Sequence, residues 1–188
     1  MALDLYLVRH GETAWSHTGQ HTGRTDLPLL QEGEEDARRL GQALSGVQFA
    51  AVYSSDLQRA LRTAQLAGFQ HPQVTPLLRE FDYGDYEGLT SAEIWAQRPG
   101  WQIYADGCPG GETPAQVYSR AEAFLSWLSG IEGAAIAFSH GHFLRAVAVA
   151  WVDLGIGAAA RVALDTAAVS VLRDGERGRV IQRWNVTV

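Results

Sequence analysis

The sequence predicts an α/β fold of three layers, in which a mostly parallel central sheet lies between two layers of helices. Short apolar stretches alternate along the chain with stretches whose apolar residues recur at helical spacing. Strands that alternate with helices pair in parallel and are covered on both faces. The 188 residues contain no repeat or linker, and 46% of them are hydrophobic, which is enough for one core. We therefore expect a single domain over residues 1–188.

The first half of the chain is expected to supply three strands and two helices. Leu3–Val8 is a short apolar strand, and Gln31–Leu44 is an amphipathic helix. Phe49–Ser55 is a second buried strand, and "SDLQRALRTAQLAG" after it is a helix. Val74–Leu77 is expected to be a short third strand.

The ends of the helix after the second strand carry their own signals. Ser55 and Gln58 resemble a capping box at its beginning. Gly68 follows its last turn and is expected to end it, because glycine readily adopts the left-handed conformation found there.

The second half continues the alternation of strands and helices. Thr113, Pro114 and Gln116 combine a cap residue, a proline in the first turn and an amide three residues on, which predicts the beginning of a helix. Ala134–Phe138 is a central apolar strand, and "HFLRAVAVAWVDL" is the apolar helix after it.

Two strands are expected at the end of the chain, Ala168–Arg173 and Val180–Trp184, joined as an antiparallel hairpin by "DGERG". The apolar stretch Val147–Leu154, which includes Trp151, fits either the core or an interface between two copies. A homodimer therefore stays open.

The charged residues restrict the chemistry. All 15 basic residues are arginines, so Schiff-base lysines, pyridoxal-phosphate enzymes and the lysine of a nucleotide-binding P-loop are excluded. Arginine is well suited to phosphate, because its planar guanidinium group meets two oxygens at once. The net charge of −6 provides no basic face for nucleic acid.

Other features bear on the compartment. No apolar run is long enough to span a bilayer, and Asp4 interrupts the first apolar stretch, which lacks the basic start of a signal peptide. The single cysteine, Cys108, excludes an internal disulfide and fits a reducing compartment. We expect a cytoplasmic protein that binds neither a membrane nor nucleic acid.

Cations and imidazoles follow three of the predicted strands. Arg9 and His10 come after the first strand, Arg59 lies one turn into the helix after the second, and His140 with Gly141 follows the central strand. In open α/β sheets ligands bind beyond the carboxyl ends of the strands, where these residues would meet. Two guanidinium groups, two imidazoles and a helix N-terminus at one edge predict a phosphate site.

Five sequence blocks, in this order, resemble the phosphoglycerate-mutase-like branch of the histidine phosphatase superfamily: "LVRHGET", "GRTDLPL", "SSDLQRALRTA", "LREFDYGDYEG" and "SHGH". The resemblance runs from Leu3 to about His142. It implies a phosphoglycerate mutase-like fold and a phosphohistidine enzyme that needs no metal and no cofactor.

The resemblance also implies a role for each catalytic position. His10 is the nucleophile, Glu80 is the proton donor, and the phosphoryl group is held by Arg9, Arg59 and His140. Elementary chemistry agrees, because negative charge on the phosphoryl oxygens is stabilised by fixed cations. A nucleophilic imidazole must be neutral, and nearby guanidinium groups favour that state.

The proton donor is open to a second reading from the residues. "EFDYGDYE" offers four carboxylates, and Glu87 is the alternative to Glu80. Another branch of the superfamily uses an aspartate directly after the second histidine. Gly141 occupies that position here, so this route is closed.

The substrate is expected to be a small phosphorylated metabolite. Blocks such as "WQIYADGCPGGET" and "HGHFLRAVAVAW" resemble the sugar-bisphosphatase members, which act on sedoheptulose or fructose bisphosphates. Beyond the phosphate-holding residues named above and Gly141, the residues expected to contact phosphate or substrate are Ser16, Gln20, Thr22, Gly23 and Arg145.

Three competing readings stay open beside a phosphatase. A mutase would return the phosphoryl group to its substrate, and a silent copy would only bind phosphometabolites. His140 with His142, or His17 with His21, offers part of a metal site, but no set of carboxylates converges on either pair. No metal ligand is therefore assigned.

Overall fold

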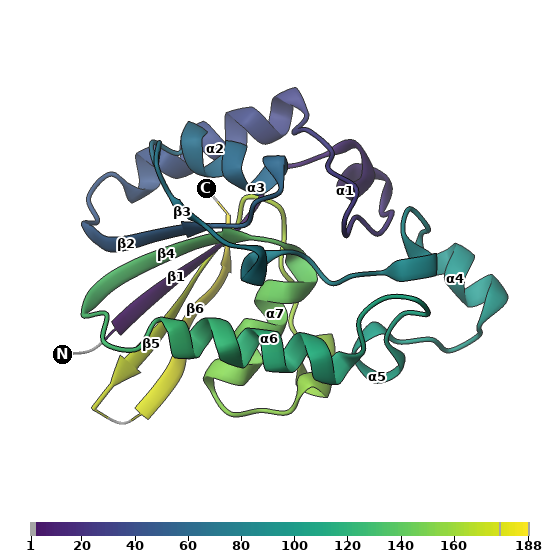
Figure 1. Cartoon of the computed structure of the whole chain (residues 1–188). Coiled ribbons are helices and arrows are strands. Elements are labelled where there is room, and N and C mark those ends of the chain that lie inside the picture. The colour runs from purple at the N-terminus through teal and green to yellow at the C-terminus, as the bar shows by residue number, and fades with distance from the viewer. Residues whose placement is uncertain (1–2, 177, 188) are drawn as a thin grey trace.

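A computed structural model describes residues 3–176 and 178–187, which form one mixed sheet between two helical layers (Figure 1). Within these residues the sheet has six strands in the order β3-β2-β4-β1-β5-β6. The strands are β1 Leu3–Arg9, β2 Phe49–Ser54, β3 Gln73–Val74, β4 Gly133–Ser139, β5 Val169–Gly175 and β6 Gly178–Val186. β1 to β4 are parallel, β5 is antiparallel to β1, and β6 is antiparallel to β5.

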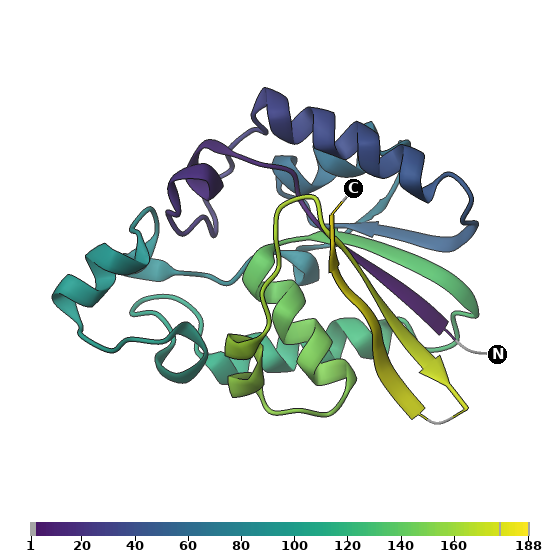
Figure 2. The same cartoon turned by 180° about the vertical axis from the view of Figure 1, so that it is seen from behind.

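The helices of the described chain surround this sheet. They are α1 Ala14–Thr18, α2 Gln31–Leu44, α3 Gln58–Leu66, α4 Ser91–Gln97, α5 Ile103–Asp106, α6 Pro114–Trp127 and α7 Gly141–Trp151, with 3-10 turns η1 Pro76–Leu78, η2 Gly84–Tyr86 and η3 Ile156–Arg161. α2 and α3 cover one face of the sheet, and α6 and α7 cover the other, as opposite views show (Figures 1 and 2). The predicted three-layer α/β/α sandwich is confirmed.

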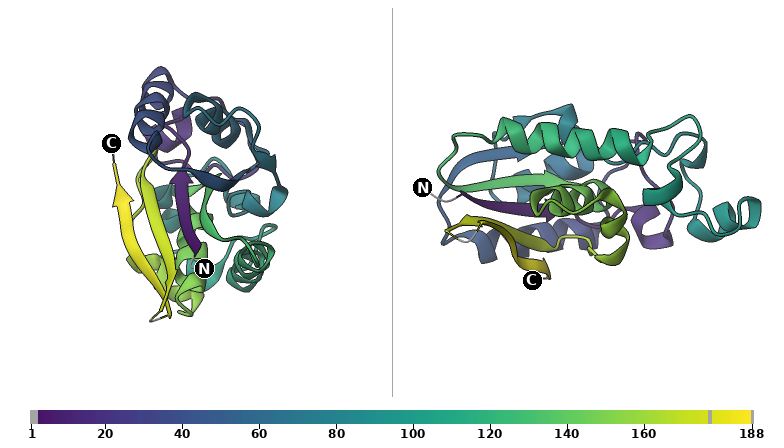
Figure 3. Two further views of the ribbon diagram at one scale, coloured as in Figure 1. Left: turned by 90° about the vertical axis from the view of Figure 1, so that its left-hand side faces the viewer. Right: turned by 90° about the horizontal axis from the view of Figure 1, so that it is seen from below.

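The central strands explain why both faces are covered. In β4, Ala135 and Ala137 pack into the larger cluster with α6 and α7, whereas Ile136 and Phe138 pack into the cluster with α2 and α3. Successive side chains of a strand point to opposite faces, so an unbroken apolar stretch must be buried on both. Views along and across the strands show the sheet held between the two layers (Figure 3).

Two local predictions are wrong. Only Gln73–Val74 of the third strand pairs with β2, because Pro76 begins a 3-10 turn that Thr75 caps through its side chain. The helix after β2 has no capping box: its N-cap is Leu57, which makes no side-chain cap bond. The Asp26 carboxylate, from a distant loop, accepts the Gln58 backbone N–H instead, at 2.8 Å.

Other local predictions are confirmed. Thr113 and Gln116 form the predicted capping box at the beginning of α6. The final hairpin is antiparallel, although Arg177 in its connection lies outside the described residues. Trp151 of the apolar stretch Val147–Leu154 is buried in the core of the chain, so its side chain is not free for an interface. No described helix has the length and apolarity that a bilayer crossing requires.

The carboxyl ends of the parallel strands meet at one edge of the sheet. α1, α4 and α5 lie beyond this edge, on the right of Figure 1. The helices α3 and α7 begin there, directly after β2 and β4. Side chains from the two strand ends and from the loop after β1 therefore gather at this edge.

Candidate active site

The loop after β1 is held by backbone contacts to its neighbours. The His10 N–H donates to the Ser139 carbonyl of β4 at 2.9 Å, and the Gly11 N–H donates to Oγ1 of Thr63 at 3.0 Å. The loop also lies against the first turn of α2, where a Cβ on Gly11 would lie 2.3 Å from the Gly33 carbonyl oxygen. The close approach of this loop to α2 therefore requires glycine at both position 11 and position 33.

His10 is buried as a neutral imidazole. Its Nδ1 lies 2.7 Å from the Gly11 carbonyl oxygen, which can only accept, so Nδ1 carries the proton and Nε2 is left with a free electron pair. Burial, assisted by the Arg59 and Arg9 guanidinium groups, holds the pKa of His10 well below its usual value of 6.5. The side chain is 4% exposed.

The Arg9 guanidinium group lies beside His10 and is only partly paired. Its Nη1 donates to the Leu164 carbonyl at 2.5 Å, whereas its buried Nε has no acceptor in the described structure. A Cβ on Gly141 would lie 3.2 Å from this Nε, so the glycine makes room for the cation. Burial lowers the pKa of Arg9 below its usual value.

The segment that accepts from Arg9 is held in turn by β6. Trp184 Nε1 donates to the Ala163 carbonyl at 2.5 Å, and Oδ1 of Asn185 accepts the Asp165 N–H at 2.7 Å. The last strand thus sets the position of residues 163–165, on which the orientation of Arg9 depends.

Arg59 is completely buried, and most of its donors are used within the protein. Nη1 donates to the Thr25 carbonyl at 2.9 Å, and Nη2 donates to the carbonyls of Thr22 and Gly23 at 3.0 and 2.9 Å. Burial lowers the pKa of Arg59. Its positive charge nevertheless lies close enough to depress the pKa of His10.

His140 is completely buried, with its ring centroid 5.1 Å from that of His10. Its Nδ1 accepts from Nε of Arg59 at 3.1 Å, and its Nε2 lies 2.9 Å from Oγ of Ser55. Burial and the Arg59 charge hold the pKa of His140 well below 6.5, so this imidazole is also neutral.

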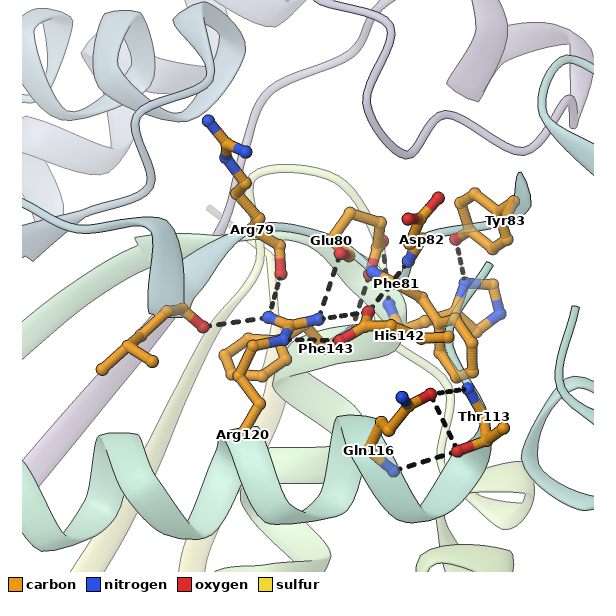
Figure 4. Close-up of polar contacts among 12 residues, drawn as sticks. Arg79, Glu80, Phe81, Asp82, Tyr83, Thr113, Gln116, Arg120, His142 and Phe143 are labelled. Atoms are coloured by element: carbon orange, nitrogen blue, oxygen red, sulfur yellow. Dashed lines mark hydrogen bonds and ion pairs between the residues drawn. The ribbon is translucent and has the colours of Figure 1, made fainter. Parts of the chain in front are cut away.

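Glu80 lies at the N-terminus of α7 (Figure 4). Its Oε2 accepts the His142 N–H at 3.0 Å, and its Oε1 accepts the Phe143 N–H at 2.8 Å. Arg120 supports the backbone of this segment, because its Nη2 donates to the Glu80 carbonyl at 3.1 Å and to Glu112 at 2.8 Å.

Glu87, the alternative proton donor, lies against the loop of residues 23–25. Its carboxylate accepts the N–H groups of Gly23 and Thr25 at 2.9 and 3.0 Å. These residues belong to the loop whose carbonyls accept from Arg59. Glu87 therefore orders that loop, and it is not among the described residues that line the cavity at His10.

A cavity of about 150 Å³ opens at His10. Of the residues predicted from the sequence, it is lined by Arg9, His10, Ser16, Gln20, Thr22, Glu80, Gly141 and Arg145. The other three, Gly23, Arg59 and His140, are not among the described lining residues, and Arg59 donates to the carbonyl of Thr22, which is one of them. Ser16 also caps α1, since its Oγ accepts the Thr13 N–H at 2.8 Å.

Three polar wall residues were assigned no substrate contact from the sequence: His21, Tyr83 and His142. The two imidazoles stack with centroids 5.9 Å apart, and the Tyr83 hydroxyl lies 2.7 Å from Nδ1 of His142. Burial, with Arg145 and His21 nearby, holds the pKa of His142 well below 6.5. The sequence signal was the position of His142 in the first turn of the helix after β4.

Within residues 3–176 and 178–187, no group of three or more His, Cys, Asp or Glu side chains lies close enough together to hold a metal ion. Nδ1 of His142 is hydrogen-bonded to the Tyr83 hydroxyl, and Nδ1 of His21 lies 2.7 Å from the Leu89 carbonyl oxygen.

Comparison with known proteins agrees with this geometry. A sequence model of the histidine phosphatase superfamily (branch 1) matches residues 5–187. The chain belongs to the histidine phosphatase superfamily. This histidine phosphatase is 43% identical over 171 residues to an acid phosphatase of Mycobacterium tuberculosis, covering 89% of this chain and 84% of the relative.

Two further comparisons extend the relationship. The histidine phosphatase is 34% identical to sedoheptulose 1,7-bisphosphatase of Saccharomyces cerevisiae, with 80% of this chain and 68% of the relative covered. The solved structure of an open reading frame from Mycobacterium tuberculosis has a TM-score of 0.94 and 39% identity, covering 98% of this chain and 97% of that chain. The chain is therefore a phosphatase of this family that acts on phosphate esters.

Proposed function

We propose that this histidine phosphatase hydrolyses small phosphate monoesters, in particular sugar phosphates, through a phosphohistidine on Nε2 of His10. The observation that carries the proposal is the bond between Nδ1 of His10 and the Gly11 carbonyl. It fixes the tautomer in which Nε2 is unprotonated, within a buried and neutral ring beside Arg9. Such a nitrogen is a competent nucleophile.

The reaction has two steps. Nε2 of His10 attacks phosphorus, the P–O ester bond breaks, and Glu80 as a carboxylic acid gives its proton to the leaving oxygen. Glu80 as a carboxylate then takes a proton from water, the hydroxyl oxygen bonds to phosphorus, and the P–N bond breaks to release phosphate. His10 and Glu80 line the same cavity, which supports this pairing.

Arg9 and Arg59 have different roles in the proposal. Arg9 lines the cavity with donors to spare and contacts the phosphoryl oxygens. Arg59 acts mainly through its charge and through the loop that it orders, since four hydrogen bonds already engage it. His140 completes the clamp from behind, where Arg59 and Ser55 orient its ring. Fixed positive charge of this kind stabilises the transition state.

The substrate class is proposed from the other half of the cavity wall. Gln20, His21, Thr22 and His142 carry hydrogen-bonding side chains, which suit hydroxyl groups. The relative named sedoheptulose 1,7-bisphosphatase supports a phosphorylated sugar. The cavity is small and polar, which favours a metabolite over a phosphorylated protein.

The test is to trap the phosphoenzyme with a ³²P-labelled sugar phosphate. We expect label on the wild-type protein that survives alkali and is lost in acid, release of inorganic phosphate, and activity in excess EDTA. His10→Asn should give neither label nor turnover. The exposed His71 supplies the matched control, and His71→Asn should behave as wild type. Turnover by His10→Asn would refute the nucleophile, and transfer of label to a second sugar in place of water would indicate a mutase.

A further inference from the structure

The segment of residues 79–83, which carries Glu80, belongs to no helix or strand of the described chain. Such a segment lacks the repeated backbone pairing of regular structure, so other groups must supply the partners of its N–H and carbonyl groups. Figure 4 shows the Arg120 side chain extending from α6 to the backbone of this segment. The proposed hydrolysis needs the Glu80 carboxyl group at a fixed place beside the leaving oxygen.

The Arg120 guanidinium group uses all of its N–H bonds within the protein. Nη1 donates to the carbonyls of Leu77 and Arg79 at 2.9 and 2.6 Å, and Nη2 donates to the Glu80 carbonyl at 3.1 Å. Nε and Nη2 also form a bidentate pair with Glu112, at 2.9 and 2.8 Å. These five acceptors match the five N–H bonds of a guanidinium group. Arg120 is not among the described residues that line the active-site cavity, so it binds the protein and not the substrate.

Glu112 extends these contacts to the other side of Glu80. Its Oε2 accepts the Asp82 N–H at 3.0 Å, and its own N–H donates to the Asp82 carbonyl at 2.9 Å. The side chains of Arg120 and Glu112 are only 16% and 21% exposed, so water competes little for their hydrogen bonds. The pair therefore holds the backbone before and after Glu80 in a defined geometry.

Arg120 also contacts a residue that binds the Glu80 carboxylate. The guanidinium carbon lies 4.2 Å from the centre of the Phe143 ring, which is completely buried. The Phe143 N–H donates to Oε1 of Glu80 at 2.8 Å. One side chain thus contacts both the backbone of Glu80 and the first turn of α7, to which the Glu80 carboxylate is hydrogen-bonded.

We propose that Arg120, held by Glu112, is a positioning residue for the proton transfer at Glu80. It keeps the Glu80 carboxyl group within hydrogen-bonding distance of the leaving oxygen and touches neither the phosphate nor the rest of the substrate. General acid catalysis depends on this distance, and a displacement of about 1 Å can cost about 10²-fold in rate. The inference rests on the proposed function, because it requires Glu80 to be the acid.

The first experiment measures the single-turnover rate of phosphoenzyme formation in Arg120→Lys, with fructose 6-phosphate and with p-nitrophenyl phosphate. Lysine keeps the positive charge, but its three N–H bonds cannot serve five acceptors. We expect the rate to fall about 10- to 100-fold for the sugar phosphate. The loss should be far smaller for p-nitrophenyl phosphate, because nitrophenolate leaves without a proton. An equal loss with both substrates would indicate general damage to the fold and would overturn the proposal.

Arg173→Lys is the matched control, since Arg173 also forms a bidentate pair, with Asp4 at 2.6 and 2.5 Å. Neither residue is among those described as lining the active-site cavity. This variant should keep both rates, and urea unfolding reports the stability of each variant. Glu112→Gln should repeat the substrate dependence of Arg120→Lys to a smaller degree, and it decides the question if Arg120→Lys does not fold.

The double variant Glu80→Gln/Arg120→Lys tests whether Arg120 acts through Glu80. Once residue 80 has no proton to give, its position no longer affects the proton transfer. Arg120→Lys should therefore cause no further loss with the sugar phosphate in the Glu80→Gln background, whereas a multiplied loss would overturn the inference. If Glu80→Gln alone shows no dependence on the leaving group, the acid of the proposed function is wrong and the inference fails with it. If Glu80→Gln shows that dependence and Arg120→Lys does not, only the positioning role has failed.

Discussion

Nε of Arg59 donates a hydrogen bond to Nδ1 of His140 over 3.1 Å, between two side chains that are completely buried. The bond requires an unprotonated Nδ1, so Nε2 of His140 carries the proton and donates to Ser55. The Arg59 guanidinium group has five N–H bonds. Three of them donate to carbonyls of the 22–25 loop and a fourth to His140, which leaves one for a ligand. Arg59 thus joins that loop to the end of β4.

Replacing Arg59 with lysine should therefore damage the structure as well as the reaction. An ammonium group cannot serve His140 and the carbonyls of the loop at once, and each buried acceptor left unpaired costs about 1–3 kcal/mol. We expect Arg59→Lys to lower the free energy of unfolding by more than about 2 kcal/mol and to reduce kcat/KM. Urea denaturation and steady-state kinetics measure the two effects.

Arg9→Lys is the matched comparison, because one hydrogen bond from the Arg9 side chain to the protein is found in the described structure. Its loss should appear chiefly in kcat/KM, with a smaller change in stability than Arg59→Lys. Equal losses of stability in the two variants would contradict this division of roles.

The proton donor can be tested through the leaving group. Glu80→Gln cannot protonate a leaving oxygen, and loss of general acid catalysis typically costs about 10²- to 10⁴-fold. The single-turnover rate of phosphoenzyme formation should fall by this order for a sugar phosphate and far less for p-nitrophenyl phosphate, whose leaving group needs no proton. Quench-flow measurement with both substrates gives the comparison.

Glu87→Gln is the control for Glu80→Gln. Glu87 accepts N–H groups of the 23–25 loop, so its replacement should lower thermal stability. Its effect on the rate should be the same for both substrates. A dependence on the leaving group in Glu87→Gln alone would transfer the role of acid to Glu87.

Gly33 in the first turn of α2 should not tolerate a methyl group. Its Cβ would lie 2.4 Å from the Glu12 carbonyl oxygen, so Gly33→Ala must push the loop that follows His10. We expect a loss of about 1–3 kcal/mol in stability and a lower kcat, although alanine is the better helix former. Gly46, with nothing within 4 Å of its Cβ position, provides the control, and Gly46→Ala should cost neither. Urea unfolding measures the stability of both variants, and steady-state kinetics measure their kcat.

Three buried histidines make the stability sensitive to acid. The pKa values of His10, His140 and His142 are all held well below 6.5 in the folded chain, chiefly by burial. As pH falls through about 6.5 the unfolded chain binds protons that the native chain does not, so the free energy of unfolding falls. The slope is at most about 1.4 kcal/mol per pH unit for each histidine.

Urea unfolding at pH 7.5, 6.5 and 5.5 in buffers without phosphate measures this slope. His142→Asn should flatten it, and His71→Asn should leave it unchanged, because His71 is exposed. A slope that is the same in His142→Asn as in the wild type would show that His142 binds protons equally in the folded and unfolded chains, against this prediction.

The central strand of the sheet was predictable because Ala134–Phe138 is apolar at every position. Ala135–Phe138 is buried on both faces, and this leaves a plain signal in the sequence. The helices α1, α4 and α5 were missed because they have only five, seven and four residues, too few for a period to show. For α4 a signal was present, since Thr90 and Glu93 form a capping box.

The sequence predicts which residues meet at the site, but it does not predict which protein groups each of them binds. That Arg9, His10 and His140 lie together follows from parallel strands that end at one edge. Three of the four acceptors of Arg59 are backbone carbonyls of a loop, and a backbone carbonyl carries no residue-specific signal. The Asp26 carboxylate that accepts the Gln58 backbone N–H at the start of α3 lies 32 positions away, so the sequence around that helix does not show it.

Two side-chain hydrogen bonds from β6 hold residues 163–165 and so link the last strand to the active site. Trp184 and Asn185 lie in β6, and through Ala163 and Asp165 they hold the segment that orients the Arg9 guanidinium group toward the cavity. Loss of these two side-chain contacts is therefore expected to weaken catalysis, although both residues lie far from His10 in the sequence.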